Sequence, residues 1–537
     1  MGGGLMQLVA YGAQDVYLTG NPQITFWKVT YRRHTNFSME SIEQTFNGQA
    51  DFGRRVTCTI SRNGDLAYRT YLQVTLPEIN QAMKGTGEPG VWARWLDFPG
   101  EQMISQVEVE IGGQRIDRQY GDWMHLWNQL TLSKEQERGY YKMIGNTTQL
   151  TFITDPSFSA VDGPCAASAP VQVCEPRNAL PETTLYVPFQ FWYCRNPGLA
   201  LPLIALQYHE VKINLDIRPI DECLWAVSNL GCTDTTSKRV TSAYNQSLVA
   251  ASLYVDYVFL DTDERRRMAQ NPHEYLIEQL QFTGDESVGS SSNKIKLNFN
   301  HPCKELVFVV QPDANVDYCS SLTCGTTLYR TLGAQPFNYT DGIDALPNSI
   351  MAFGSKLETQ TGDFIQGSGL FADPGSVDIT ATTSWGTNHI FNKTTLVAPN
   401  DKNTTSSVSD AGSFVLCESS LDMHCWGQNP VVTAKLQLNG QDRFSEREGT
   451  YFDLVQPYQH HTRNPDTGIN VYSFALRPEE HQPSGSCNFS RIDNATLQLV
   501  LSNSTVQGTN TAKVRVYAVN YNVLRVMSGM GGLAYSN

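Results

Sequence analysis

Residues 107–117 read VEVEIGGQRID, and residues 435–444 read KLQLNGQDRF. In each stretch, polar and apolar residues alternate up to a glycine, and a glutamine and an arginine follow. Alternation with a period of two is typical of a β-strand with one buried face. The glycines Gly113 and Gly440 indicate a tight turn or a bulge just past each strand. The sequence therefore predicts two similar strand ends, separated by 435 − 107 = 328 positions.

Other strand patterns recur in the two halves of the chain in the same order. The paired segments are 56–77 with 295–312, then 196–217 with 482–501, and finally 252–261 with 512–526. A chain of 537 residues also exceeds the size at which one hydrophobic core usually stops growing. Both observations predict two consecutive domains.

The two halves differ in the spacing between corresponding strands. From the first strand to the glycine phrase is 107 − 56 = 51 residues in the first half and 435 − 295 = 140 in the second. An insertion of about 90 residues therefore lies at about 313–430, and smaller ones at about 131–185 and 218–250. Loops tolerate such insertions because the entropy of loop closure grows slowly with length.

Helical patterns are few. Trp123, Leu126, Trp127 and Leu130 follow the spacing of an apolar helical stripe, and Ser133 with Gln136 predicts a capping box for a second short helix. Both helices fall between strands of the first half, as decoration.

The predicted fold class is all-β, with two consecutive eight-stranded antiparallel jelly-roll domains, long inter-strand insertions and a few short helices. The predicted parts are an N-terminal arm at 1–30, a first jelly roll at 31–261, a linker at 262–275 and a second jelly roll at 276–537.

Charge and composition argue against several classes of protein. A formal net charge of −14 argues against direct nucleic-acid binding, which needs a concentrated positive field. The N-terminus has neither the positive n-region nor the long apolar run of a signal peptide, and no run of 18 apolar residues predicts a membrane span. The twelve cysteines are therefore expected to be reduced thiols.

Patterns that would indicate an enzyme are weak. GTGEPG at 85–90 matches a dinucleotide-binding fingerprint, but it lacks the following helix that places a phosphate. His460 and His461 are adjacent, and the chain has no His-x-His pair for a jelly-roll metal site. We predict no catalytic, cofactor-binding or metal site, and no enzymatic activity.

Four cysteines bound the large insertion, namely Cys319, Cys324, Cys417 and Cys425. Their spacing is loose compared with paired C-x-x-C motifs, so structural thiols are favoured over a zinc knot or disulfides.

Several longer phrases point to one family. They include LVAYGAQDVYLTGNPQITFWKVTYRRHTNFSMESI at 8–42, PGLALPLIALQYHEVK at 197–212 and NYNVLRVMSGMGGLAYSN at 520–537. With both glycine phrases, the chain resembles the major capsid proteins of nucleo-cytoplasmic large DNA viruses, of the phycodnavirus and mimivirus type. The resemblance runs from end to end and is weakest in the three insertions.

The resemblance implies a double jelly-roll subunit that forms homotrimeric, pseudo-hexagonal capsomers in the icosahedral shell of a large DNA virus. Three chains with two similar rolls each give six similar lobes, which would explain the internal repeat. It also implies assembly in the host cytoplasm, minor capsid proteins as partners, and an internal viral membrane near the N-terminal arm. The large insertion would form an outer tower.

Nine N-x-S/T sequons occur. The positions favoured for glycosylation are Asn338, Asn392 and Asn403, because they lie in the predicted outer insertion. Asn488 and Asn494 lie in a phrase shared with the family and are expected to be structural.

Two other functions stay open from the residues alone. A carbohydrate-binding or host-attachment jelly roll could use Tyr339, Trp385 and Trp426 as stacking platforms. A metal-dependent jelly-roll enzyme would retain bound metal after purification.

Overall fold

The computed structural model describes residues 2–88, 90–151, 180–229, 232, 234–325, 333–342 and 427–536. Most of the predicted large insertion lies outside these ranges. None of the helices within them has the length and apolar character needed to cross a membrane.

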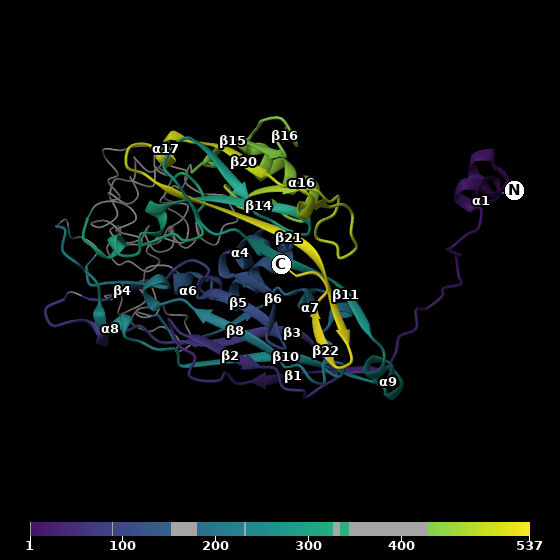
Figure 1. Ribbon diagram of the computed structural model, residues 1–537, viewed down its shortest axis with the longest axis horizontal. Coiled ribbons are helices and arrows are strands. Elements are labelled where there is room, and N and C mark those ends of the chain that lie inside the picture. The colour runs from purple at the N-terminus through teal and green to yellow at the C-terminus, as the bar shows by residue number, and fades with distance from the viewer. Residues whose placement is uncertain are drawn as a thin grey trace.

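Residues 37–260 form two four-stranded antiparallel sheets that pack face to face (Figure 1). The first has the order β1 (Phe37–Gln44), β10 (Ala250–Leu260), β3 (Leu66–Leu76) and β7 (Thr183–Pro188). The second has the order β2 (Arg55–Thr59), β8 (Val211–Ile217), β5 (Ile104–Ile111) and β6 (Gln114–Tyr120). A separate strand pair consists of β4 (Trp92–Trp95) and β9 (Leu224–Val227).

The second half repeats this arrangement. Its first sheet has the order β11 (His273–Phe282), β21 (Ala512–Met527), β14 (Pro302–Pro312) and β18 (Asn470–Ser473). Its second has the order β13 (Ser292–Leu297), β20 (Ala495–Leu501), β15 (Val431–Leu438) and β16 (Gln441–Asp442). Four short strands join these sheets, namely β12 (Glu286–Val288), β17 (Arg447–Glu448), β19 (Cys487–Asn488) and β22 (Met530–Leu533).

The two halves match strand for strand. The order β1-β10-β3-β7 corresponds to β11-β21-β14-β18, and β2-β8-β5-β6 corresponds to β13-β20-β15-β16. The prediction of two eight-stranded antiparallel jelly rolls is therefore confirmed. In the second roll, the 16-residue strand β21 pairs with β11, β12, β14 and β22.

The two glycine phrases form equivalent hairpins. Gly112 and Gly113 have φ values of 57° and 84°, and Asn439 and Gly440 have values of 50° and 81°. Two consecutive positive φ values in a two-residue loop are typical of a type I′ turn, which matches the twist of the flanking strands. The predicted tight turns are therefore confirmed, and each joins a strand to the next, β5 to β6 and β15 to β16.

Replacing Gly113 or Gly440 by alanine is expected to lower stability by about 1–2 kcal/mol in each case. A Cβ at either position meets no heavy atom within 4 Å, so the cost comes from the left-handed backbone alone. Thermal denaturation of both variants would check this. Gly139, in the middle of a helix and equally open, is the control, and its change to alanine should leave stability equal or higher. A loss in only one hairpin would contradict their equivalence.

The two predicted helices are α4 (Gly121–Thr131) and α5 (Lys134–Ile144). The predicted capping box is wrong, because the Ser133 side chain makes no cap hydrogen bond. Their description as decoration is wrong too. The apolar stripe of α4 needs a buried partner, and it packs against β14 and β21 of the second roll (Figure 1). The ring of Trp123 lies 5.6 Å from that of Tyr517.

The remaining helices are short. The α-helices are α3 (Pro99–Gln102), α6 (Thr148–Thr151), α7 (Trp192–Arg195), α8 (Thr241–Tyr244), α16 (Gln456–His460) and α17 (Asn503–Val506). The single-turn 3-10 helices and one π-helix are η2 (Gln81–Met83), η3 (Pro197–Leu199), η4 (Ile220–Glu222), η5 (Asp313–Val316), η6 (Ser320–Leu322), η7 (Tyr451–Val455) and η8 (Phe489–Arg491). Most of them lie at strand ends.

The segments outside the rolls are also structured in part. The predicted linker holds α9 (Thr262–Gln270), and β11 begins at His273, three residues before the predicted start of the second roll. The N-terminal arm contains α1 (Gly3–Val9), η1 (Ala13–Asp15) and α2 (Val16–Thr19). It runs on to residue 36, so we use the name N-terminal arm for residues 2–36 from here on.

Candidate assembly interface

A buried polar seam joins the two rolls into one body. Glu278 of β11 forms salt bridges with Arg195 of α7 at 3.1 Å and with Lys304 of β14 at 2.7 Å. Asp122 of α4 lies 3.3 Å from Arg515 of β21. Buried charges are costly unless they are paired, so this seam holds the rolls at one defined orientation.

Asp117 lies at the same junction. Its Oδ1 accepts a hydrogen bond from the Leu280 backbone N–H at 3.1 Å, which ties β6 of the first roll to β11 of the second. Gln279 adds a hydrogen bond to the Ile116 carbonyl. Burial raises the pKa of Asp117 to about 7, against the effect of its hydrogen bonds and of Arg195. The junction thus contains a carboxyl group that titrates near neutral pH.

The adjacent histidines take unequal places. His460 Nδ1 lies 3.1 Å from the Leu476 carbonyl at the surface, whereas His461 lies buried between two carboxylates. The Nε2 of His461 is 2.8 Å from Glu305, and its Nδ1 is 2.9 Å from Glu479. This is a charged structural pair rather than a metal site, because both ring nitrogens are occupied by carboxylates.

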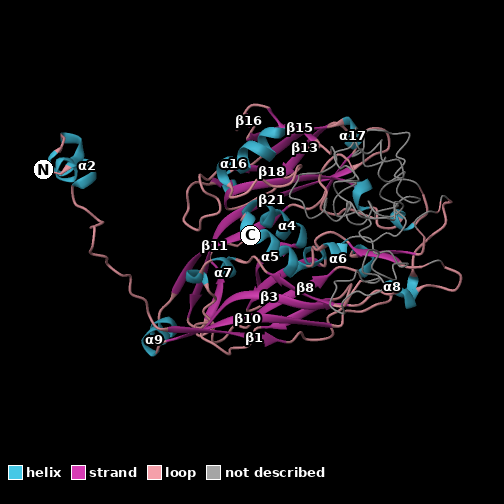
Figure 2. Ribbon diagram, turned by 180° about the vertical axis from the view of Figure 1, so that it is seen from behind, coloured by secondary structure: helices cyan, strands magenta, loops and turns pink. Residues whose placement is uncertain are grey.

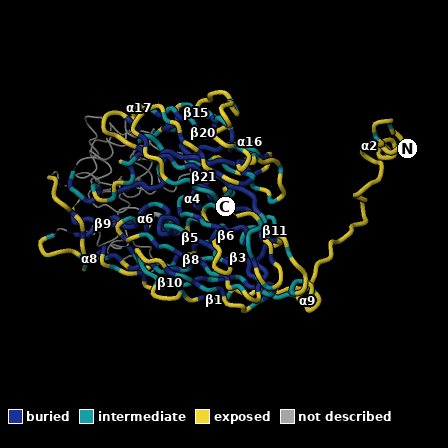
Figure 3. Tube along the Cα trace, viewed as in Figure 1, coloured by how far each residue is buried: buried dark blue, intermediate teal, exposed yellow. Residues whose placement is uncertain are grey.

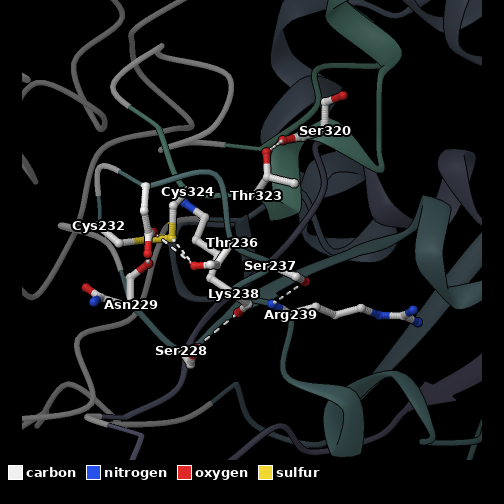
Figure 4. Close-up of a disulfide and its surroundings, with 11 residues drawn as sticks. Ser228, Asn229, Cys232, Thr236, Ser237, Lys238, Arg239, Ser320, Thr323 and Cys324 are labelled. Carbon is white, nitrogen blue, oxygen red and sulfur yellow. Dashed lines mark hydrogen bonds between the residues drawn. A yellow bond between two sulfur atoms is a disulfide. The ribbon is translucent and has the colours of Figure 1, made fainter.

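A disulfide joins Cys232 and Cys324, which are 92 positions apart (Figure 4). Cys232 belongs to the loop after β9 of the first roll, and Cys324 follows η6 at the base of the large insertion. The two segments also pair through their backbones, since Lys238 donates to Leu322 and Cys324 donates to Thr236. Two of the predicted insertions are therefore joined at their bases.

The expectation of reduced cysteines is wrong at this pair, because folding brings these two distant thiols together. Cys319 is free and exposed, while Cys417 and Cys425 lie outside the described residues. Over the described part of the chain, Cys232, Asp234 and Cys324 are the one group with enough metal-type side chains for an ion. The disulfide occupies both of its sulfur atoms, so the group offers no thiolate pair.

Changing Cys232 and Cys324 to serine is expected to lower the free energy of unfolding by about 2–4 kcal/mol. The bond limits the unfolded chain, and this effect grows with the length of the closed loop. Melting curves with and without a reducing agent would check this: reduction should lower the melting temperature of the native chain and not that of the double variant. Cys319→Ser is the matched control, and an equal loss there would contradict the assignment.

Among the segments that the structure describes, the N-terminal arm is the most exposed apolar one. None of its residues is buried, and Figures 1 and 3 show it running away from the body. Among the described residues, 13 of the 27 large exposed hydrophobic side chains lie in the arm. Contiguous exposed apolar surface of this extent is typical of an interaction site.

Comparison with known proteins identifies the family of the chain. One family model matches residues 264–532 and describes the large eukaryotic DNA virus major capsid protein. A second, for the N-terminus of the major capsid protein, matches residues 25–261. This chain belongs to that capsid protein family. Its role is structural, and its place is the virion capsid.

Relatives and solved structures agree with this assignment. The chain is 74% identical to the major capsid protein of Chrysochromulina ericina virus and 78% identical to that of Phaeocystis pouchetii virus, with 100% of both chains covered in each case. The solved capsid of PBCV-1 virus superposes with a TM-score of 0.61 at 32% identity, covering 96% of this chain and 100% of that one. The Faustovirus major capsid protein gives the same TM-score at 13% identity, which shows the shared fold alone. The family resemblance read from the sequence is confirmed.

The glycosylation positions of this capsid protein stay predictions. Asn338 is half-buried, and its Nδ2 donates hydrogen bonds to Gln335 Oε1 at 2.8 Å and to the Gly342 carbonyl at 2.9 Å. A sugar on that nitrogen requires the loop to open. Asn392 and Asn403 lie outside the described residues.

The structure describes one of the three aromatic residues proposed as stacking platforms for carbohydrate binding. Tyr339 is buried in the hydrophobic cluster formed by α4 of the first roll with β14 and β21 of the second, so it cannot stack on a sugar. Trp385 and Trp426 lie outside the described residues. Sequence reasoning did not find Cys232, Asp117 or Glu278, since each acquires its role from a partner far along the chain.

Proposed function

We propose that three copies of this chain form a capsomer with six similar lobes, which occupies the hexagonal positions of an icosahedral shell. The matching strand order of the two rolls carries the proposal. Two equivalent rolls, fixed by a buried seam, let a three-fold oligomer present near six-fold contacts to its neighbours. In this proposal the rolls are the domains predicted at 31–261 and 276–537, with strands that begin at Phe37 and at His273, and the predicted linker 262–275 holds α9.

The other partners belong to the same proposal. The N-terminal arm reaches the inner side of the shell, toward minor capsid proteins and an internal viral membrane, which its apolar exposed residues support. The net charge of −14 supports the absence of direct nucleic-acid contact. Assembly takes place in the host cytoplasm, without catalysis by this chain. The insertion at about 313–430 is the outer tower, and Asn338, Asn392 and Asn403 are the proposed glycan positions.

Light scattering coupled to size exclusion tests the trimer. The expected native mass is three times the chain mass of 59.9 kDa. Electron microscopy of the same fraction should show a three-fold particle with six lobes. A stable monomer, with the mass of a single chain across the accessible concentration range, would contradict the proposal and favour a monomeric binding module.

A further inference from the structure

The outer face of the sheet β1-β10-β3-β7 carries a row of tyrosines across its strands. The rings of Tyr71 on β3 and Tyr254 on β10 stack at 5.3 Å with an interplanar angle of 4°. Tyr186 on β7 lies 6.3 Å from Tyr71 and is 39% exposed. The row ends on β1, where Ser41 Oγ lies 3.2 Å from the Tyr71 hydroxyl. Figures 1 and 2 place β1 and β10 on the side of the molecule away from the second roll.

Acidic side chains border this row. Glu43 pairs with Tyr254 in the strand register, and Asp256 pairs with Ser41, so both carboxylates lie on the tyrosine side of the sheet. We call Tyr71, Tyr186 and Tyr254, together with Glu43 and Asp256, the tyrosine face. At the end of β1, the exposed Phe37 and Met39 extend this face with apolar surface. Tyr186 is exposed and Tyr71 and Tyr254 are partly exposed, and tyrosines in such positions beside apolar and acidic groups are typical of a protein interface that receives cations.

The N-terminal arm has the complementary chemistry. Its cations are Lys28, Arg32 and Arg33 and its one acid is Asp15, so its net charge is 3 − 1 = +2 in a chain of net charge −14. The aromatic side chains Phe26, Trp27 and Tyr31, interleaved with these cations, are 84–102% exposed. The side-chain hydrogen bonds of the described arm residues stay within the arm.

We propose that residues 24–34 of one copy lie across the tyrosine face of a neighbouring copy. Arginine and lysine can then stack on the tyrosine rings and pair with Glu43 and Asp256, while the aromatic residues of the arm cover Phe37 and Met39. The arm leaves its own body at the start of β1 and runs outward (Figure 1). At roughly 3.3 Å per residue, the extended segment from 24 to 36 spans about 40 Å, which is enough to reach an adjacent subunit.

This inference rests on the proposed self-assembly. The two parts of the arm differ in charge and have different roles in it. Residues 2–20 hold α1 and α2 and carry no cation, so they remain available for the inner side of the shell. Residues 24–34 hold every Lys and Arg of the arm and serve as the clamp between subunits.

Photo-cross-linking of the full-length protein tests the clamp. Benzoylphenylalanine replaces Trp27, and irradiation is expected to give a covalent dimer at twice 59.9 kDa. Its cross-linked peptides should map to β1, β3, β7 or β10. Combining Tyr71→Ala with Tyr254→Ala removes two ring contacts and should lower the dimer yield about tenfold. Tyr458→Ala, on α16 of the second roll and 80% exposed, is the matched control and should leave the yield unchanged.

A second pair of variants separates recognition from folding. Tyr71→Phe with Tyr254→Phe keeps both ring faces and should keep the cross-link. Glu43→Lys, at an exposed position, should lower the yield at low salt even if the alanine pair does not fold.

The outcomes for the clamp and for the trimer are distinguishable. If the native mass is that of three chains, cross-links to another face, or within a single chain only, would overturn the clamp and leave the trimer standing. A native mass of two chains, with cross-links that map to the tyrosine face, would overturn the trimer and still support the clamp, whereas a native mass of one chain would overturn both.

Discussion

Replacing His461 by alanine is expected to lower the free energy of unfolding by about 3–5 kcal/mol at pH 7. The side chains of His461 and Glu305 are both fully buried, and the imidazole lies between Glu305 and Glu479. Without the imidazole, the buried carboxyl group of Glu305 loses the cation that pairs with it, and a buried ionisable group without a partner is destabilising whether it stays charged or takes up a proton. Denaturant titration followed by tryptophan fluorescence would measure the loss.

The pH dependence distinguishes a charged pair from simple packing. Burial alone lowers the pKa of His461, but the carboxylates Glu305 and Glu479 outweigh it and raise the pKa to about 9. Because the folded pKa exceeds the ordinary value of 6.5, the stabilisation is complete below pH 6.5 and is lost as the pH rises through about 9. The alanine variant should lack this fall in stability between pH 6.5 and 9.

A double replacement is the control for His461. Glu305→Met combined with His461→Leu removes both charges and should recover most of the lost stability, because a buried ion pair can be exchanged for apolar packing at little cost. If this pair is as unstable as His461→Ala alone, removing the unpaired carboxylate gains nothing and the electrostatic explanation is wrong.

Replacing Trp123 by alanine is expected to cost about 3–5 kcal/mol and to separate the unfolding of the two rolls. Trp123 is buried in a cluster that contains α4 of the first roll with β14 and β21 of the second. The lost ring leaves a cavity at the contact that couples the rolls, so calorimetry should resolve two transitions where the native chain shows one.

Tyr458 provides the matched control for Trp123, since it is an aromatic residue that is 80% exposed on α16. Tyr458→Ala should leave the melting temperature of the native protein unchanged. A single cooperative transition in the Trp123 variant would mean that the polar seam of Glu278 and Asp122 couples the rolls by itself.

The strands and their duplication could be predicted from the sequence because the buried side chains repeat with a period of two. Apolar and polar residues alternate in the sequence over 107–111 of β5 and along β8, and burial alternates strictly along β20. The turn residues Gly113 and Gly440 mark the same hairpin in each roll. The partner of α4 could not be predicted. An apolar stripe shows that a helix is buried, but not which surface buries it.

Contacts between residues far apart in the sequence could not be predicted either. The disulfide partners Cys232 and Cys324 are 92 positions apart, and nothing in either local pattern connects them. The tyrosine face likewise depends on the register in which the strand at 37–44 and its neighbours pair with the strand at 250–260. The exposure of the N-terminal arm also depends on what it fails to contact, which sequence alone does not show.

The position of β21 near the end of the chain has a consequence for synthesis. The strands of the first roll are all made once residue 260 has left the ribosome, while more than half of the chain is still to come. The second roll cannot be completed this early, because β11, β12, β14 and β22 all pair with β21 at 512–527. Translation must finish before that sheet can close. Until then, the nascent chain carries all strands of the first roll and an incomplete second roll. A capsomer that needs both rolls can therefore form only after translation has finished, whereas both surfaces of the clamp are already made with the first roll.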